Sequence, residues 1–205
     1  PNTVLGFGVF LACASVIILG LTINYFAAIL LACSIAFYIF IYTIWLKRKT
    51  HHNIVIGGAA GAFPPIIGWA CVTESLSLFP IILFLIIFIW TPPHFWALAL
   101  YKDTEYSKVE VPMLPVVHGK KNTKFQILCY SLLLFLTSSL PFVLGFSGQI
   151  YLVASLILNL LFIFFAIRLT LSNDHNNDIR ASHLFKFSIL YLYLIFTSFV
   201  VDKFL

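Results

Sequence analysis

Residues 76–100 read LSLFPIILFLIIFIWTPPHFWALAL, a run of 25 residues without a charged side chain. A helix needs about 20 apolar residues to cross a membrane, because each residue advances it by about 1.5 Å through a hydrocarbon core about 30 Å thick. Pro92 and Pro93 lack backbone donors and are expected to break this helix. A histidine, His94, follows them. The stretch predicts a membrane span with a polar group inside it.

The rest of the chain has the same character. Of its 205 residues, 61% are hydrophobic and 9% are charged, and the mean hydropathy is +1.04. A soluble domain of this size could not cover itself with so little polar surface. No run alternates apolar and polar residues as a membrane β-strand does, so the fold class is all-α, a polytopic transmembrane helical bundle. The seven expected spans cover residues 4–22, 25–46, 54–72, 76–100, 125–144, 149–171 and 184–201.

Lysine and arginine predict the orientation of these spans. Connections 47–52, 102–124 and 168–186 hold 11 of the 12 basic residues, and alternation of the spans puts all three connections on one side. By the positive-inside rule this side is cytoplasmic. The net charge of +5 reflects this bias and gives no support to nucleic-acid binding.

One of the inner connections offers fixed cations, and the next also offers carboxylates. Lys47 and Arg48 lie in one, and Lys102, Asp103 and Glu105 lie in the next. Each set alone could be a solvated or anchoring group. Together they favour a diphosphate on a lipid tail, because Mg²⁺ binds one or two carboxylates plus substrate phosphates, and cations neutralise phosphate charge.

The stretch 53–69 is rich in small residues and has two interpretations. Gly57 and Gly61 are four residues apart, so they either let helices pack closely or leave room for a bulky ligand. Pro64 and Pro65 then break the helix and free carbonyl groups that need partners.

His94 also has two interpretations. It is either a hydrogen-bonded structural residue, or it contacts an aromatic ligand or metal or moves a proton. Trp90, Phe95 and Trp96 are either core or a surface for a flat ring. If the helix continues, Glu105 lies on nearly the same face as His94, about 16 Å further along.

Two blocks resemble the protohaem IX farnesyltransferases, a family of UbiA-type intramembrane prenyltransferases. They are YTIWLKRKTHHNIVIGGAAGAFPPIIGW at 42–69 and WTPPHFWALALYKDTEYSKVEVPMLPVVHG at 90–119, and the likeness extends over the whole chain. The resemblance implies transfer of farnesyl from farnesyl diphosphate to a vinyl group of haem b, giving haem O. It also implies Mg²⁺ as the cofactor, and haem A synthase or terminal oxidase assembly proteins as further partners. The place would be a bacterial cytoplasmic (inner) membrane or a mitochondrial inner membrane, with the site on the cytoplasmic or matrix side.

By position, the resemblance assigns roles to individual residues. It implies a catalytic role for His94, Asp103 and Glu105, with both acids also binding the metal. His94, Trp90 and Trp96 become candidates for contact with haem. The residues expected to bind diphosphate are Tyr42, Lys47, Arg48, Asn53 and Lys102.

The chain corresponds to only the later part of this family. The family has nine spans, and residues 1–205 match spans three to nine as a single transmembrane domain. The upstream Asn-x-x-x-Asp-x-x-x-Asp motif of the family does not occur in these residues, so we expect them to be inactive alone. Glu105 replaces the usual aspartate, and Val109-Glu110 replaces a pair of small residues.

Two other functions stay open. One is a related prenyltransferase with a phenolic acceptor, as in quinone biosynthesis, although the Pro-His-Phe block argues against it. The other is a haem or lipid carrier, or a channel component. Charges at one rim fit a conduction path poorly, because such a path needs polar groups through the midplane.

Overall fold

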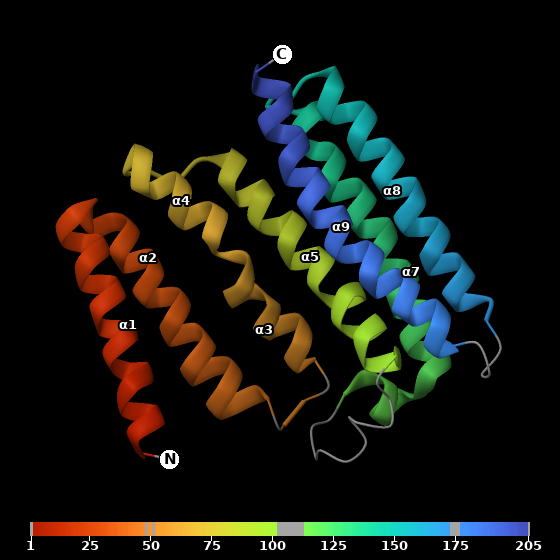
Figure 1. Ribbon diagram of the computed structural model, residues 1–205, viewed down its shortest axis with the longest axis horizontal. Helices are drawn as coiled ribbons and strands as arrows, with labels where there is room; N and C mark the ends of the chain where they lie inside the picture. Colours follow the sequence, from red (N-terminus) through yellow and green to blue (C-terminus); the bar gives the residue numbers. More distant parts are fainter. Residues whose placement is uncertain (1, 48, 51, 102–112, 173–176, 205) are drawn as a thin grey trace.

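The computed structural model describes residues 2–47, 49–50, 52–101, 113–172 and 177–204, and its regular structure in these residues is entirely helical. The helices keep their order along the chain in Figure 1. They are α1 (Asn2–Thr22), α2 (Tyr25–Ala36), the π-helical η1 (Phe37–Leu46), α3 (Asn53–Ala62), α4 (Pro64–Thr73), α5 (Leu78–Tyr101), α7 (Leu114–Val143), α8 (Gln149–Thr170) and α9 (Asn177–Phe204).

Within the described residues, seven helical segments are long and apolar enough to cross a membrane. The predicted fold class and number of spans are therefore confirmed, and the chain is an integral, multi-pass membrane protein. Two spans are composite, since α2 continues into η1 and α3 is followed by α4. Helical structure already begins at Leu114, inside the connection predicted at 102–124, but the non-helical Gly119, with φ +80°, kinks α7.

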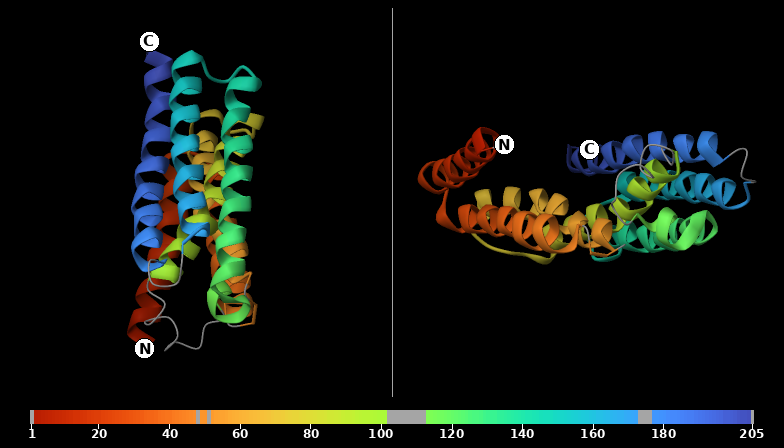
Figure 2. Two further views of the ribbon diagram at one scale, coloured as in Figure 1. Left: turned by 90° about the vertical axis from the view of Figure 1, so that its right-hand side faces the viewer. Right: turned by 90° about the horizontal axis from the view of Figure 1, so that it is seen from below.

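The helices form two parts. Helices α5, α7, α8 and α9 pack around one another in a cycle, and we call them the bundle. The remaining helices form an arm: α3 and α4 pack on α5, α2 and η1 pack on α3 and α4, and α1 packs chiefly on α2. Figures 1 and 2 show the arm extending from one side of the bundle. Most of the buried apolar core lies in the bundle.

The outermost helix, α1, leaves its apolar side chains uncovered within the chain. Val4 is 77% exposed and Leu21 is 72% exposed. In a membrane protein such a surface faces lipid or another apolar partner, because hydrocarbon does not penalise it.

Polar contacts fasten the arm where its helices begin and break. Asn24 accepts a hydrogen bond from the Ala27 backbone nitrogen at 2.7 Å, which caps α2. Its Nδ2 donates to the Ala70 carbonyl at 3.0 Å and so connects α2 to α4. Ser34 donates to the Ala60 carbonyl at 3.3 Å. Pro64 cannot donate to that carbonyl, so the hydroxyl compensates for the break.

The two proline pairs act differently. Pro64 and Pro65 separate α3 from α4, as expected. Pro92 and Pro93 do not break α5, so that expectation is wrong. Both rings are buried, and the helices packed against α5 hold its path although two backbone donors are missing.

The described ends of the three basic connections lie at one end of the molecule. The lower end in Figure 1 holds the end of η1, next to Lys47, and the start of α3 at Asn53. It also holds the end of α5 at Tyr101, the start of α7 next to Met113, the end of α8 and the start of α9, together with the N-terminus. The alternation inferred from the sequence is therefore present in the fold.

Candidate functional site

A cavity of about 450 Å³ lies where the arm meets the bundle, between η1, α3 and α5. It extends to the end of the molecule that carries the basic connections, since Met113 at the start of α7 is part of its wall. The residues that line it are Tyr38, Tyr42, Ile54, Gly57, Gly58, Gly61, Ile87, Trp90, Thr91, Phe95 and Met113.

The glycines of α3 shape this cavity, each in its own way. A Cβ atom at Gly57 would overlap the ring of Tyr42, and one at Gly58 would lie 2.7 Å from Thr91 Cγ2. These two glycines therefore allow the close approach of η1 and α5. Gly61 has nothing within 4 Å of the position of a Cβ, and it leaves space in the cavity. Close packing and room for a ligand are thus both present.

The π-helix η1 brings two tyrosines to the cavity wall. The ring centroids of Tyr38 and Tyr42 are 5.3 Å apart. The Lys47 backbone nitrogen donates to the Tyr42 carbonyl at 2.8 Å, a bond spanning five residues. Wide turns of this kind are rare and frequently occur at functional sites. The geometry connects Tyr42 directly to the start of the basic connection.

Asn53 closes the same connection from its other end. Its side chain is 1% exposed, and Nδ2 donates to the Lys47 carbonyl at 3.0 Å. Its Oδ1 has no hydrogen-bond partner among the described residues. The contact that the structure gives Asn53 is therefore with the backbone of the basic connection, and its predicted contact with diphosphate stays a prediction.

His94 lies on α5 beside α9. Its Nδ1 is 2.6 Å from Ser188 Oγ, and its ring stacks on Trp90 with a centroid distance of 4.3 Å. On its other side it stacks on Phe185 at 4.8 Å. Trp90 donates from Nε1 to the Ser188 carbonyl at 2.8 Å. Protein rings thus occupy both faces of the imidazole. Neither His94 nor Phe185 lines the cavity, whereas Trp90 does.

Trp96 lies on another face of α5. Its side chain is 2% exposed and makes an edge-to-face contact with Tyr130 of α7, with centroids 5.3 Å apart. It is part of the bundle core and does not line the cavity. The structure therefore brings together Tyr42 and Trp90 but separates Trp96 from them.

Four predicted site residues, Arg48, Lys102, Asp103 and Glu105, lie outside the described residues. The residues that flank them are placed. The exposed Lys47 precedes Arg48 at the end of η1, and Met113, at the far end of the acidic connection, lines the cavity. Among the described residues no group of three or more His, Cys, Asp or Glu could hold a metal ion.

Sequence reasoning missed several residues around the cavity. Tyr38 carries a local signal, because it precedes Tyr42 by one helical turn on the same span. Ser188 and Phe185 carry none, since they belong to α9, more than 90 residues after His94 in the chain. Only the packing of α5 against α9 brings them to the site.

The described lining suits an apolar reactant with a charged head. Aromatic and aliphatic side chains form most of the wall, and η1 contributes the two tyrosines. The hydroxyl of Thr91 is already occupied, because it donates to the Ile87 carbonyl at 2.8 Å. Basic Lys124 is not available either: it is buried, and its Nζ donates to the Ser172 carbonyl at 2.9 Å.

Comparisons with known proteins agree with this geometry. Residues 1–190 match the model of the UbiA prenyltransferase family. The chain is 49% identical over 202 residues to the protoheme IX farnesyltransferase of Neorickettsia sennetsu, covering 98% of this chain and 65% of that protein. The protein of the same name from Parvibaculum lavamentivorans is 53% identical over 200 residues, covering 97% of this chain and 63% of that protein. The Pelagibacter ubique protein, also of that name, is 51% identical over 205 residues, covering 100% and 68%.

The chain thus spans about two thirds of the length of these relatives. Its fold is similar to that of a solved chain from work described as "Structural and mechanistic insights into the biosynthesis of Digeranylgeranylglyceryl phosphate synthase in membranes". The TM-score is 0.78 at 22% identity, and the match covers 98% of this chain and 69% of that chain. This likeness concerns the fold alone.

Proposed function

Because the chain belongs to the UbiA prenyltransferase family, we propose that the complete protein transfers a farnesyl group from farnesyl diphosphate to haem b and so forms haem O. Relatives near 50% identity bear the name protoheme IX farnesyltransferase, which specifies both the group transferred and the acceptor. The two sequence blocks at 42–69 and 90–119 support the same assignment. In this proposal the chain is the later part of a longer protein, and residues 1–205 alone are inactive.

One observation carries the proposal: residues that flank the two charged connections, Ile54 and Met113, line the same cavity. The basic connection begins five residues after Tyr42, and the acidic connection ends at Met113, and both residues line the cavity. A diphosphate at this mouth would meet Lys47 and Arg48 from one side, and Lys102, Asp103 and Glu105 from the other. Its apolar chain would lie along the aromatic wall.

The donor set fits a divalent metal ion. The pair Asp103 and Glu105 supplies hard carboxylate oxygens, and diphosphate oxygens can complete the shell, which is the arrangement that Mg²⁺ prefers. Lys47 and Arg48 would bind the remaining phosphate oxygens. When bound, the metal ion stabilises the negative charge that develops on the leaving diphosphate.

The protein's own residues then protect and direct the carbon chemistry. When the bond between farnesyl C1 and the diphosphate oxygen breaks, the allylic cation is surrounded by Tyr38, Tyr42, Trp90 and Phe95. Their faces attract positive charge, and the apolar wall excludes water that would capture the cation early. The terminal vinyl carbon of haem b would form the new bond to C1 and leave the positive charge on the inner vinyl carbon. Water would then add to that carbon and release a proton, giving the hydroxyethylfarnesyl side chain.

The contacts of His94 favour an indirect role. Its imidazole stacks on the indole of Trp90, and both side chains form a hydrogen bond with Ser188. We propose that His94 is a positioning residue for this aromatic wall. Direct contact of His94, Trp90 or Trp96 with haem stays a prediction.

The proposed location follows the charge pattern and the relatives. The basic connections would face the cytoplasm of a bacterium or the matrix of a mitochondrion, with the diphosphate site on that side. Transfer of haem from or to haem A synthase or an oxidase assembly protein stays a prediction.

The test is turnover by the complete protein in membranes supplied with haem b, farnesyl diphosphate and Mg²⁺. We expect haem O, identified by mass spectrometry. Asp103→Asn should abolish its formation because the metal loses a charged ligand. Glu74→Gln, which removes an exposed carboxylate at the opposite end of the molecule, should keep wild-type turnover.

Three results would contradict the assignment or a part of it. Absence of haem O from the wild-type reaction removes the proposed activity. Prenylation of 4-hydroxybenzoate in preference to haem b would indicate the phenolic acceptor instead. Unchanged haem O output in Asp103→Asn would remove Asp103 from the proposed metal site, whereas a carrier would be favoured if the wild-type protein bound haem b but formed no haem O.

A further inference from the structure

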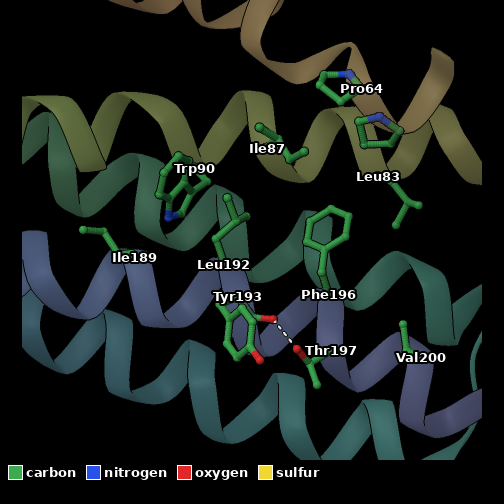
Figure 3. A pocket seen from close by; sticks show the side chains of 11 residues that line it. Pro64, Leu83, Ile87, Trp90, Ile189, Leu192, Tyr193, Phe196, Thr197 and Val200 are labelled. Atoms are coloured by element: carbon green, nitrogen blue, oxygen red, sulfur yellow. Dashed lines mark hydrogen bonds between the residues drawn. The ribbon is translucent and has the colours of Figure 1, made fainter. Parts of the chain in front are cut away.

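An apolar groove of about 840 Å³ adjoins the candidate cavity, and Ile87 and Trp90 line both hollows. The groove runs between α5 and α9 and is bordered by the prolines that begin α4 (Figure 3). Trp90 and Ile189 stand at one end and Val200 at the other. From Ile189 to Val200 the wall of α9 extends over eleven residues, about 16 Å of helix.

The lining of the groove fits a hydrocarbon chain. None of its residues is charged. Of its few polar groups, Thr197 Oγ1 donates to the Tyr193 carbonyl at 2.9 Å, and the Trp90 indole nitrogen donates to Ser188. A ligand would therefore bind there by apolar contact.

Trp90 is held firmly at the boundary between the two hollows. Its indole reaches from α5 to the Ser188 carbonyl of α9 at 2.8 Å. The His94 ring stacks on it within 20° of parallel, and His94 is itself fixed by Ser188 Oγ and Phe185. An aromatic side chain fixed by a hydrogen bond and a stack cannot move aside without losing both contacts.

We propose that Trp90 determines the length of the isoprenoid chain that the site accepts. The inference rests on the proposed function and adds a specificity residue to it. An isoprenyl diphosphate with its head at the charged mouth extends past Ile87 to Trp90, and its terminal isoprene unit enters the groove only as far as the indole permits. In this proposal a farnesyl chain ends at the indole, and a longer chain would have to pass it.

The test compares two chain lengths in one reaction. The complete protein is supplied with haem b and equal amounts of farnesyl and geranylgeranyl diphosphate, and the two haem products are quantified by mass spectrometry. Trp90→Ala should raise the ratio of the geranylgeranyl to the farnesyl product about tenfold or more over wild type, the scale on which apolar pockets discriminate between chains. Trp90→Phe should give a smaller rise.

Phe88→Leu is the matched control. Phe88 is an aromatic residue two positions earlier on α5 that stacks on Phe84 and lines neither hollow. It should leave the product ratio at the wild-type value. A ratio in Trp90→Ala within twofold of wild type would overturn the proposal.

A second measurement needs binding only. A farnesyl diphosphate analogue with a diazirine at its terminal carbon is photolysed in membranes that contain the wild-type protein. Label is expected on Ile189 or Leu192 of α9, which line the groove nearest Trp90. Label found only on α1 or α2, or only on lipid molecules and not on the protein, would overturn the proposal. This measurement uses the wild-type protein, so it holds even if the Trp90 variants fail to fold.

The two hypotheses fail in different ways. If the wild type makes no haem O but the analogue labels α9, the proposed reaction is wrong and the groove remains an isoprenoid site. If haem O forms and neither the product ratio nor the label behaves as expected, the role of Trp90 is wrong and the reaction stands.

Discussion

Single residues in this site act mainly by the space they leave and the neighbours they hold. Gly57 has no side chain, so the ring of Tyr42 can lie against α3. Ser188 uses its hydroxyl on His94 and its carbonyl on Trp90, so one residue of α9 fixes two rings of α5. Asn53 fixes the Lys47 carbonyl in the same manner. The groups that would meet the substrate depend on these contacts for their position.

The two glycines of α3 give a matched pair of substitutions. Gly57→Ala should displace the Tyr42 ring, lower the transfer rate and cost about 1–3 kcal/mol of stability, because the added methyl overlaps ring atoms. Gly61→Ala adds the same methyl where nothing lies within 4 Å, and should leave the unfolding temperature unchanged or slightly raised. Thermal unfolding in detergent and the rate of haem O formation measure both. Equal effects of the two substitutions would contradict this account of Tyr42.

At the level of helices, polar side chains buried in the bundle hold α7, α8 and α9 in register. Asn159 of α8 accepts a hydrogen bond from the Tyr191 hydroxyl of α9 at 2.9 Å and donates to Ser138 Oγ of α7 at 2.8 Å. Tyr151 of α8 donates to the Ser138 carbonyl at 2.6 Å. Apolar contacts between helices and lipid are similar in strength to those between helices, so such bonds favour one arrangement. They keep α9 in place as a wall of the groove.

Asn159→Ala should destabilise the protein by about 1–3 kcal/mol, because it leaves the buried Tyr191 hydroxyl without an acceptor. Ser155→Ala is the control on the same helix. Ser155 is equally buried, but its hydroxyl bonds only to the Leu152 carbonyl one turn away. Its replacement should change stability by less than about 0.5 kcal/mol. The unfolding temperature in detergent separates the two outcomes, and a control variant as unstable as Asn159→Ala would refute the interhelical role.

The two ends of the molecule along the membrane normal differ in charge and in the length of their connections. The described ends of all three basic connections, the mouth of the cavity and the π-helix are at one end. At the other end α4 and α5, and α7 and α8, are joined by short connections. Under the proposed function, charge at one end would both orient the protein in the membrane and supply the cations that bind diphosphate.

Accessibility from the two sides of the membrane tests this orientation. Lys49→Cys and Ser75→Cys place single thiols on exposed residues at opposite ends, in a background without the four native cysteines. A membrane-impermeant maleimide applied to intact bacterial cells should label Ser75→Cys and not Lys49→Cys. Inverted vesicles should give the reverse result. Labelling of Lys49→Cys from outside would place the charged connections on the wrong side for a cytoplasmic diphosphate.

Composition and charge alone determined the membrane class, the seven spans and the common side of the basic connections, because hydrocarbon permits only long apolar helices and the charge bias follows from insertion. Local sequence also predicted the helix break at Pro64, and the family resemblance pointed to Tyr42, which the structure places on the cavity wall. Local sequence failed at Pro92, where packing of neighbouring helices outweighs the loss of backbone donors, and it could not separate Trp90 from Trp96, two aromatic residues six positions apart on one helix. The tertiary structure decided that Trp90 lines the cavity, that Trp96 is core, and that Ser188 of α9 fixes His94. Those facts depend on which faces of distant helices meet, and that is set by the packing of the whole bundle.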